Sequence, residues 1–128
     1  MSLLVLIRIP LFPFVTNKEK ASKPTGIAHI IANKGGVCVA FRLFNTSFFF
    51  VNCHLDAKAS RVKERIQSYQ KLTRSLRTGH TSLESISLYD HVFFLGDFNF
   101  RVQRTFESTV QMATDNKISE ILSYDQML

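Results

Sequence analysis

Apolar residues occur along the chain in short runs that alternate with polar segments. Four runs have the length and composition of strands: residues 3–9, 37–44, 48–53 and 91–95. Runs without polar alternation are typical of strands that are covered on both faces. We therefore predict that all four strands lie in the core, and that Pro10 and Pro13 end the first of them.

The segments between these runs have the composition of turns and loops. Residues 16–26 are polar and basic and contain a proline and a glycine, which predicts a loop. A short apolar run follows at residues 27–31, and residues 33–36 (NKGG) predict a turn with two permissive glycines. Asn45 lies between two predicted strands and is expected in a hairpin turn.

The period of the pattern then changes, and apolar residues recur at three- and four-residue steps. These residues are Val62, Ile66, Tyr69, Leu72 and Leu76. Their spacing predicts an amphipathic helix of about five turns that ends at Gly79. The opposite side of this helix carries the basic residues Arg61, Lys63, Arg65, Lys71, Arg74 and Arg77. A second helical pattern begins at Thr105.

Composition limits the class of protein. With 128 residues, of which 45% are apolar, the chain is one globular domain or part of one. Its net charge of +6 favours anionic partners such as phosphates, nucleic acid or an acidic lipid surface, although a solvated basic helix gives the same charge. Arg8 and the two prolines interrupt the apolar N-terminal run, which argues against a signal peptide or a membrane span.

The two cysteines, Cys38 and Cys53, lie within apolar runs, and no metal-binding pair of the C-x-x-C type is present. Buried thiols of this kind are expected in a reducing compartment, without a disulfide framework. We therefore predict a cytoplasmic protein, with peripheral contact at membranes as a further location.

Polar side chains follow two of the predicted strands, at the points where these strands end. One strand ends in FVNCHLDA, which contains Asn52 and His54, and the other ends in FLGDFNFR, which contains Asp97, Asn99 and Arg101. Residues two apart in an extended chain point to the same side. If the two strands are neighbours in one sheet, their polar groups converge at one edge.

This set of side chains suits the attack of water on a phosphate. A carboxylate such as Asp97 can take a proton from water or hold a cation, and a histidine exchanges protons near neutral pH. An asparagine can orient water or stabilise a developing oxyanion, and Gly96 lets a ligand or backbone approach closely. The structural alternative is that Gly-Asp-x-Asn is a common turn sequence and that His54 is structural.

Three segments of the chain together resemble the catalytic domain of inositol polyphosphate 5-phosphatases. They are ANKGGVCVAFRLFNTSFFFVNCHLDA, VFFLGDFNFRV and ILSYDQM, in this order. The resemblance covers nearly the whole chain, and the combination of motifs is more specific than any one of them. These enzymes belong to the endonuclease/exonuclease/phosphatase superfamily, whose α+β fold is a four-layer α/β sandwich of two packed mixed sheets flanked by helices. The resemblance implies that residues 1–128 form the central portion of such a catalytic domain.

The resemblance also implies an activity, a cofactor and roles for residues. The implied activity is Mg²⁺-dependent hydrolysis of the 5-phosphate of inositol phosphates or phosphoinositides, by a phosphoric monoester hydrolase. Asp97 and Asn99 match the residues that activate and position the attacking water, and His54 matches a residue at the scissile phosphate. The expected substrate-binding residues are Lys34, Asn52 and Arg101, and no residue is assigned as a metal ligand.

The chain departs from the usual motifs of this family. Ala32 replaces a glycine before the NKGG turn, Cys53 replaces a serine, and Asp56, Ala57 and Lys58 replace two small residues and a second histidine. The family's upstream metal-binding glutamate and its downstream P-[AS]-W-C-D-R segment have no counterpart, and the chain contains no Trp. We therefore expect the N-terminal and C-terminal parts of the domain to be missing and the isolated chain to be inactive.

Alternatives to this reading stay open. The chain is a fragment of an active enzyme or an inactive, divergent relative, and the presence of Asp97, Asn99 and His54 favours the fragment. A nuclease of the same superfamily would suit the positive charge, but NKGG and FNFR fit the phosphatase branch better, so no nucleic-acid partner is expected. A third alternative is a non-enzymatic module that its basic helix holds at an anionic membrane. The expected partners are inositol phosphates or phosphoinositides, and the sequence sets no oligomeric state.

Overall fold

A computed structural model describes residues 1–26, 34–76, 78 and 85–128 of the chain. Its elements are η1 (Ile9–Phe14), β1 (Val15–Pro24), β2 (Gly35–Leu43), β3 (Thr46–His54), α1 (Val62–Ser75), η3 (Ser85–Leu88), β4 (His91–Asp97), α2 (Phe106–Thr114) and α3 (Ile118–Leu122). The predicted apolar run at residues 27–31 and part of the predicted NKGG turn lie outside the described residues.

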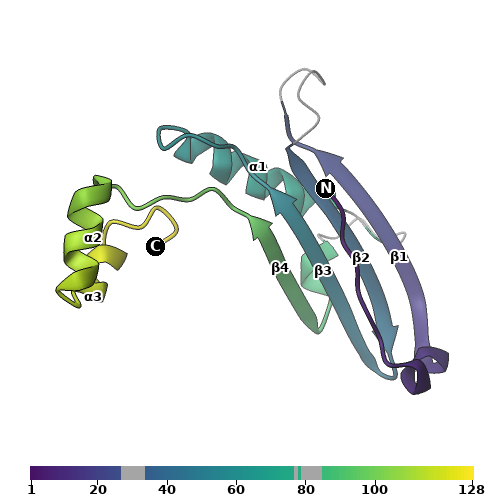
Figure 1. The fold of residues 1–128 in the computed structure, drawn as a ribbon. Helices are drawn as coiled ribbons and strands as arrows, with labels where there is room; N and C mark the ends of the chain where they lie inside the picture. The colour runs from purple at the N-terminus through teal and green to yellow at the C-terminus, as the bar shows by residue number, and fades with distance from the viewer. Residues whose placement is uncertain (27–33, 77, 79–84) are drawn as a thin grey trace.

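The four strands form one mixed sheet in the order β1-β2-β3-β4 (Figure 1). β1, β2 and β3 pair antiparallel, whereas β3 and β4 pair parallel. A parallel pair needs a crossover connection, and α1 lies in the connection between β3 and β4. The sequence prediction of three of these strands and of α1 is therefore confirmed, with strand bounds that shift by at most two residues. α1 ends at Ser75, and the predicted stop at Gly79 lies outside the described residues.

α1 covers one face of the sheet, and the core lies between them. The buried side chains there are Cys38, Ala40, Phe49, Val51, Cys53, Leu55, Leu72 and Leu76. They alternate along β2 and β3 with residues that point to the opposite face, as the period of an extended strand requires. The expectation that these strands are fully buried on both faces is wrong, because α1 covers only one of them.

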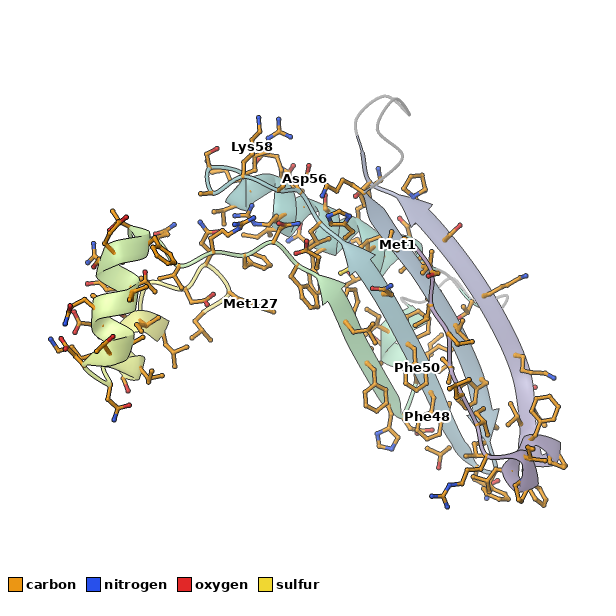
Figure 2. The ribbon with its side chains drawn as sticks, in the orientation of Figure 1. Met1, Phe48, Phe50, Asp56, Lys58 and Met127 are labelled. Atoms are coloured by element: carbon orange, nitrogen blue, oxygen red, sulfur yellow. The ribbon has the colours of Figure 1, made fainter. Side chains whose placement is uncertain are left out.

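The opposite face, here called the aromatic face, carries a row of rings across three strands. Phe41, Phe48, Phe50, Phe93 and His91 form neighbouring ring pairs with centroids 4.9 to 6.3 Å apart. Figure 2 shows Phe48 and Phe50 on β3 near one end of the sheet. Phe93 is 46% exposed and its neighbour Leu95 is 40% exposed, so this face is covered only in part.

The first predicted strand is absent. Residues 1–8 carry no regular secondary structure, and Ile9–Phe14 form a 3₁₀ helix that contains both prolines. The segment runs beside β2 on the aromatic face (Figure 1), with Leu3 near Val37 and Val39, while Leu4 and Leu6 are 80% and 84% exposed. A strand requires a paired neighbour for its backbone hydrogen bonds, and no strand of the described residues pairs with residues 3–9.

The predicted loop at residues 16–26 is mostly strand β1. It pairs with β2 from Val15↔Leu43 to Pro24↔Gly35, with a bulge between Thr16 and Glu19. Its polar composition misled the prediction, because an edge strand with charged side chains can be exposed and still be held by the backbone of its neighbour.

The face of α1 that packs on the sheet also differs from the prediction. Leu72 is buried as expected, but Ile66 and Tyr69 are 43% and 42% exposed. Arg65, placed on the solvated side by its charge, is fully buried together with Ser68. The buried side of α1 is therefore rotated toward the loop that follows β3.

The C-terminal helices are peripheral. α2 and α3 contact each other and lie apart from the sheet (Figure 1), and neither contains a buried residue. Thr105 begins α2 as an N-cap whose hydroxyl accepts from the Ser108 amide. No helix in the described part of the chain is long and apolar enough to cross a membrane.

Candidate active site

The ends of β3 and β4 bring two predicted catalytic residues together. The parallel register pairs His54 with Asp97, and the imidazole Nε2 lies 3.6 Å from the Asp97 Oδ2. The Leu55 amide donates to the Asp97 carbonyl at 2.9 Å, which extends the ladder one residue further. The prediction that His54 and Asp97 lie close at one edge of the sheet is confirmed.

Lys34 joins this pair from the start of β2. Its Nζ lies 2.5 Å from the His54 Nε2, because Gly35 is the register partner of His54. An ammonium group can only donate, so Nε2 is the acceptor in this contact. A cation, an imidazole and the 63% exposed side chain of Asp97 thus share one edge.

Asn99 and Arg101 continue the site beyond β4. The Asp97 Oδ1 accepts from the backbone N–H of Asn99 at 3.0 Å. Asn99 has a left-handed φ of 57°, so the chain turns there instead of continuing as a strand. The Asn99 Nδ2 donates to the Leu55 carbonyl at 3.0 Å, and its Oδ1 accepts from Arg101 Nη2 at 3.1 Å. The turn, rather than strand alternation, brings Asp97 and Asn99 together.

Gly96 is required by the close approach of the two strands. Its φ is 119°, and a Cβ built there would lie 2.0 Å from the Cys53 carbonyl oxygen and 2.6 Å from the Asn52 Oδ1. Any side chain would therefore displace β4 from β3 directly beside Asp97. The glycine allows the backbone of one strand to approach the other, as the sequence predicted.

Asn52 occupies the same face as His54 but has a structural partner. Its Nδ2 donates to the Ser2 carbonyl at 2.7 Å, which fastens the N-terminal segment across the aromatic face. Its register partner is Leu95, two residues before Asp97. The structure therefore brings His54, Asp97, Asn99, Lys34 and Arg101 into one cluster, with Asn52 at its border.

Cys53 lies between these residues but points to the core. Burial raises the pKa of its thiol from an ordinary value of 9.0 to about 11, and the nearby charge of Asp97 adds to the shift. Burial also raises the pKa of Cys38. Both thiols are free and protonated at neutral pH, so neither is suited to act as a nucleophile.

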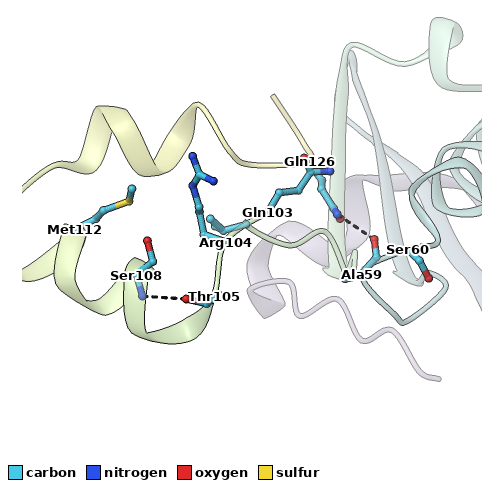
Figure 3. A pocket seen from close by; sticks show the side chains of 9 residues that line it. Ala59, Ser60, Gln103, Arg104, Thr105, Ser108, Met112 and Gln126 are labelled. Carbon is cyan, nitrogen blue, oxygen red and sulfur yellow. Dashed lines mark hydrogen bonds between the residues drawn. The ribbon is translucent and has the colours of Figure 1, made fainter.

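A cavity of about 850 Å³ lies beyond the site, between the loop after β3 and helix α2 (Figure 3). Ala59, Ser60, Arg104, Ser108 and Gln126 are among its lining residues. None of the clustered residues lines it, so its volume says nothing about the chemistry at His54 and Asp97. The predicted site is an exposed edge, which is open to solvent on the aromatic face.

The described residues do not form a complete site for a divalent cation. Mg²⁺ prefers six oxygen ligands in near-octahedral geometry. Asp97 offers one carboxylate, whereas the Asn99 amide oxygen already accepts from Arg101. No group of three acidic, histidine or cysteine side chains that could hold a metal occurs among the described residues.

Sequence reasoning missed two residues that connect the site. Arg65 and Gln126 hydrogen-bond to each other and to the loops that follow β3 and β4. Gln126 sits in the ILSYDQM motif that carried the resemblance, which was the available signal for it. Arg65 had none, because a basic residue on an amphipathic helix is normally solvated.

Comparison with known proteins places this geometry in a family. Residues 1–128 match Endonuclease/Exonuclease/phosphatase family 2. Synaptojanin-2 of Rattus norvegicus is 32% identical over 125 residues, and inositol-1,4,5-trisphosphate 5-phosphatase 1 of Schizosaccharomyces pombe is 31% identical over 126 residues. Both alignments cover 98% of this chain but only 8% and 12% of the relatives.

Solved structures agree with the sequence comparison. The inositol polyphosphate 5-phosphatase domain of SPsynaptojanin, in complex with inositol (1,4)-bisphosphate and calcium ion, matches with a TM-score of 0.81 and 32% identity. That match covers 92% of this chain and 33% of the solved one. A Cimex nitrophorin matches with a TM-score of 0.61 at 18% identity, which shows a shared fold alone.

These matches confirm the α+β class and the resemblance on which the sequence prediction rested. The chain spans about a third of the solved phosphatase domain, and its mixed sheet with helices is a part of that fold. The chain belongs to the endonuclease/exonuclease/phosphatase family, and its relatives there are inositol polyphosphate and phosphoinositide 5-phosphatases.

Proposed function

We propose that this chain supplies part of the active site of a 5-phosphatase, which removes the 5-phosphate from inositol phosphates or phosphoinositides as part of a longer chain. The observation that carries the proposal is the cluster at the ends of β3 and β4, where His54 lies beside both Asp97 and Lys34. Relatives with 5-phosphatase names and a solved domain with bound inositol bisphosphate support the same chemistry.

Each clustered residue has a role that its position allows. Asp97 is exposed and can accept a proton from the attacking water, and Asn99 can hold that water or the developing charge on the phosphate. His54 and Lys34 face the same edge and can contact the scissile phosphate. Arg101 supplies a second cation, and Asn52 is a further substrate contact once its bond to Ser2 is released.

Mg²⁺ dependence belongs to this proposal, although the described residues by themselves offer the ion no complete set of ligands. When bound, the ion would neutralise negative charge on the phosphoryl oxygens. A cytoplasmic location and peripheral contact with an anionic membrane are also proposed, since the substrates include lipid headgroups and the chain has a net charge of +6.

Phosphate release from inositol 1,4,5-trisphosphate tests the proposal. We expect negligible release by the chain alone, and Mg²⁺-dependent, chelator-sensitive release once the chain is joined to the flanking sequence of a complete relative. In that active form, Asp97→Ala or Asn99→Ala should lower kcat by about a hundredfold or more, because each removes a group that acts on water or developing charge. His54→Ala should also be damaging.

Two controls separate the outcomes. Arg42→Ala removes an exposed guanidinium that donates to the Asn45 carbonyl at the far end of β2, and should change kcat little. Asp115→Asn removes an exposed carboxylate at the end of α2, a helix that lies apart from the sheet (Figure 1). Full activity in Asp97→Ala would overturn the proposal, and cleavage of DNA without release of inositol phosphate would replace it with a nuclease.

A further inference from the structure

Arg65 is a buried cation for which the proposed function has no use. Its side chain is 0% exposed, yet no ion pair among the described residues includes it. Its Nε has no hydrogen-bond partner in the described part of the chain. A buried guanidinium without a carboxylate is costly unless other acceptors compensate for its lost hydration. The acceptors that it does have therefore indicate its role.

One set of acceptors comes from the loop that follows β3. Arg65 Nη1 donates to the carbonyls of Asp56 at 3.1 Å and Lys58 at 2.6 Å, and Nη2 donates to the Ala59 carbonyl at 3.4 Å. Carbonyls so close in sequence converge on one group only if the loop curls, and Lys58 has a left-handed φ of 76°. Figure 2 shows Asp56 and Lys58 beside α1 at this end of the sheet. The loop begins directly after His54 and Leu55.

The second set of contacts comes from the segment that follows β4. The Arg65 guanidinium lies over the Phe100 ring, with its Cζ 5.3 Å from the ring centroid, and Nη2 also donates to the Gln126 Oε1. Phe100 lies between Asn99 and Arg101 in the sequence. The same Gln126 oxygen accepts from the Arg101 amide at 3.1 Å.

Gln126 closes the connection between the two loops. Its side-chain Nε2 donates to the Ala59 carbonyl at 3.0 Å, shown as a dashed line in Figure 3. Its backbone N–H donates to the Arg101 carbonyl at 3.1 Å. Among the described residues, each acceptor of the Arg65 side chain is therefore a carbonyl of the loop after β3 or the oxygen of Gln126, which joins the two loops. The planar guanidinium, with several donors, can hold both loops at once, which a single ammonium cannot do.

We infer that Arg65 is a positioning residue, which fixes the loop that follows His54 relative to the segment that carries Asn99 and Arg101. No hydrogen bond or ion pair found among the described residues joins it to the clustered side chains, and it acts through backbone carbonyls, Phe100 and Gln126. That this placement serves hydrolysis rests on the proposed function, whereas the placement itself does not. It is therefore tested on the chain without substrate.

Residue-resolved hydrogen exchange of the full chain provides the test. Three amides report on the two loops: Leu55, bonded to the Asp97 carbonyl, Gln103, bonded to the Tyr124 carbonyl, and Gln126, bonded to the Arg101 carbonyl. In Arg65→Met, which keeps length but removes charge and donors, these amides should exchange about ten- to a hundredfold faster, the loss expected for charged hydrogen bonds. Amides of the β2–β3 ladder should change much less.

Rescue experiments separate positioning from simple filling of space. Added guanidinium should restore slow exchange in Arg65→Ala, and methylammonium should not, because only the planar ion reproduces the set of donors. Arg65→Lys should be intermediate, since it keeps the charge with fewer directed donors. Lys71→Met, an exposed substitution on the same helix, should leave all of these amides unchanged.

The outcomes that overturn the inference are distinct. Unchanged exchange at Leu55, Gln103 and Gln126 in Arg65→Met would show that the loops do not depend on the guanidinium. Equal acceleration in the loops and the β2–β3 ladder, or loss of folding in both Arg65→Met and Arg65→Lys, would make Arg65 a general stability residue. A failure of phosphate release by the chain joined to the flanking sequence of a complete relative would overturn the proposed function and leave the exchange result unaffected.

Discussion

The two faces of the sheet are made by the same strands but have different roles. On the face toward α1, Phe49, Val51 and Cys53 are 0 to 1% exposed and form the core. On the aromatic face, Phe48, Phe50 and Asn52 alternate with them and are half-buried. His54 and Asp97 end the aromatic face, not the core face. The residues with chemistry thus lie on the side of the sheet that the described chain covers least.

This difference shows how one strand can serve stability and function at once. Period-two alternation lets every second residue of β3 pack under α1 while the others lead to the site. Substitutions on the two faces should therefore have separable effects, and four predictions follow the order of their expected size.

The largest difference is expected between Phe49→Ala and Phe93→Ala. Phe49 is fully buried, so removing its ring should lower the free energy of unfolding by about 3–5 kcal/mol. Phe93 is 46% exposed, and its ring stacks on that of Phe50 with the centroids 4.9 Å apart. Removing the Phe93 ring should therefore lower the free energy of unfolding by less than about 1.5 kcal/mol. Urea unfolding followed by circular dichroism measures both. Similar costs would contradict the assignment of the core to the α1 side.

Gly96→Ala should be the next most damaging change, because it strikes the boundary between the strands at the site. The positive φ and the contact with the Cys53 carbonyl oxygen should together cost about 3 kcal/mol. Gly36→Ala is the matched control, since its Cβ would meet the Leu72 side chain at 3.0 Å and backbone atoms would not have to move. The same unfolding experiment compares them, and an equal or smaller cost for Gly96→Ala would show that β4 can move without penalty.

Stability should fall in alkaline solution because of Cys53. Its pKa is raised from 9.0 to about 11 in the folded chain, so the unfolded chain loses the thiol proton first. The stabilisation is complete below pH 9.0 and should be lost as the pH rises toward 11, by about 2 kcal/mol. Unfolding midpoints across this range measure it. Cys53→Ala should reduce the fall in stability with rising pH, and the part that remains is attributed to Cys38. If stability falls with pH as steeply in Cys53→Ala as in the original chain, burial of Cys53 is not the cause.

A substitution on the aromatic face should have the smallest effect on stability. It should have a clear effect on association between copies of the chain. Exposed Phe93 and Leu95 lie on β4, which is an edge strand, and such edges favour association between chains. We expect the chain alone to be poorly soluble or weakly cooperative in unfolding, and Phe93→Lys to raise its solubility. Sedimentation at increasing concentration tests this. A soluble monomer with a sharp unfolding transition would show instead that these residues form a self-sufficient domain.

The sequence predicted the strands with the clearest apolar runs. It failed at the two segments whose structure depends on pairing with a neighbouring strand. β2, β3, β4 and α1 followed from length and period. The N-terminal run at residues 3–9 had the composition of a strand but pairs with no strand of the described residues, while polar β1 pairs with β2. Hydrogen bonds to a neighbouring strand outweigh composition at both places.

The candidate site divides in the same way. The sequence by itself determined its residue types and its position at the ends of two strands, because motifs and strand runs are local features. Only the tertiary structure decided that β3 and β4 are parallel neighbours, that Asn99 reaches Asp97 by a turn, and that Asn52 bonds to Ser2. It also decided the burial of Arg65, since whether a charge on a helix is solvated or satisfied by distant carbonyls depends on contacts that no local pattern contains.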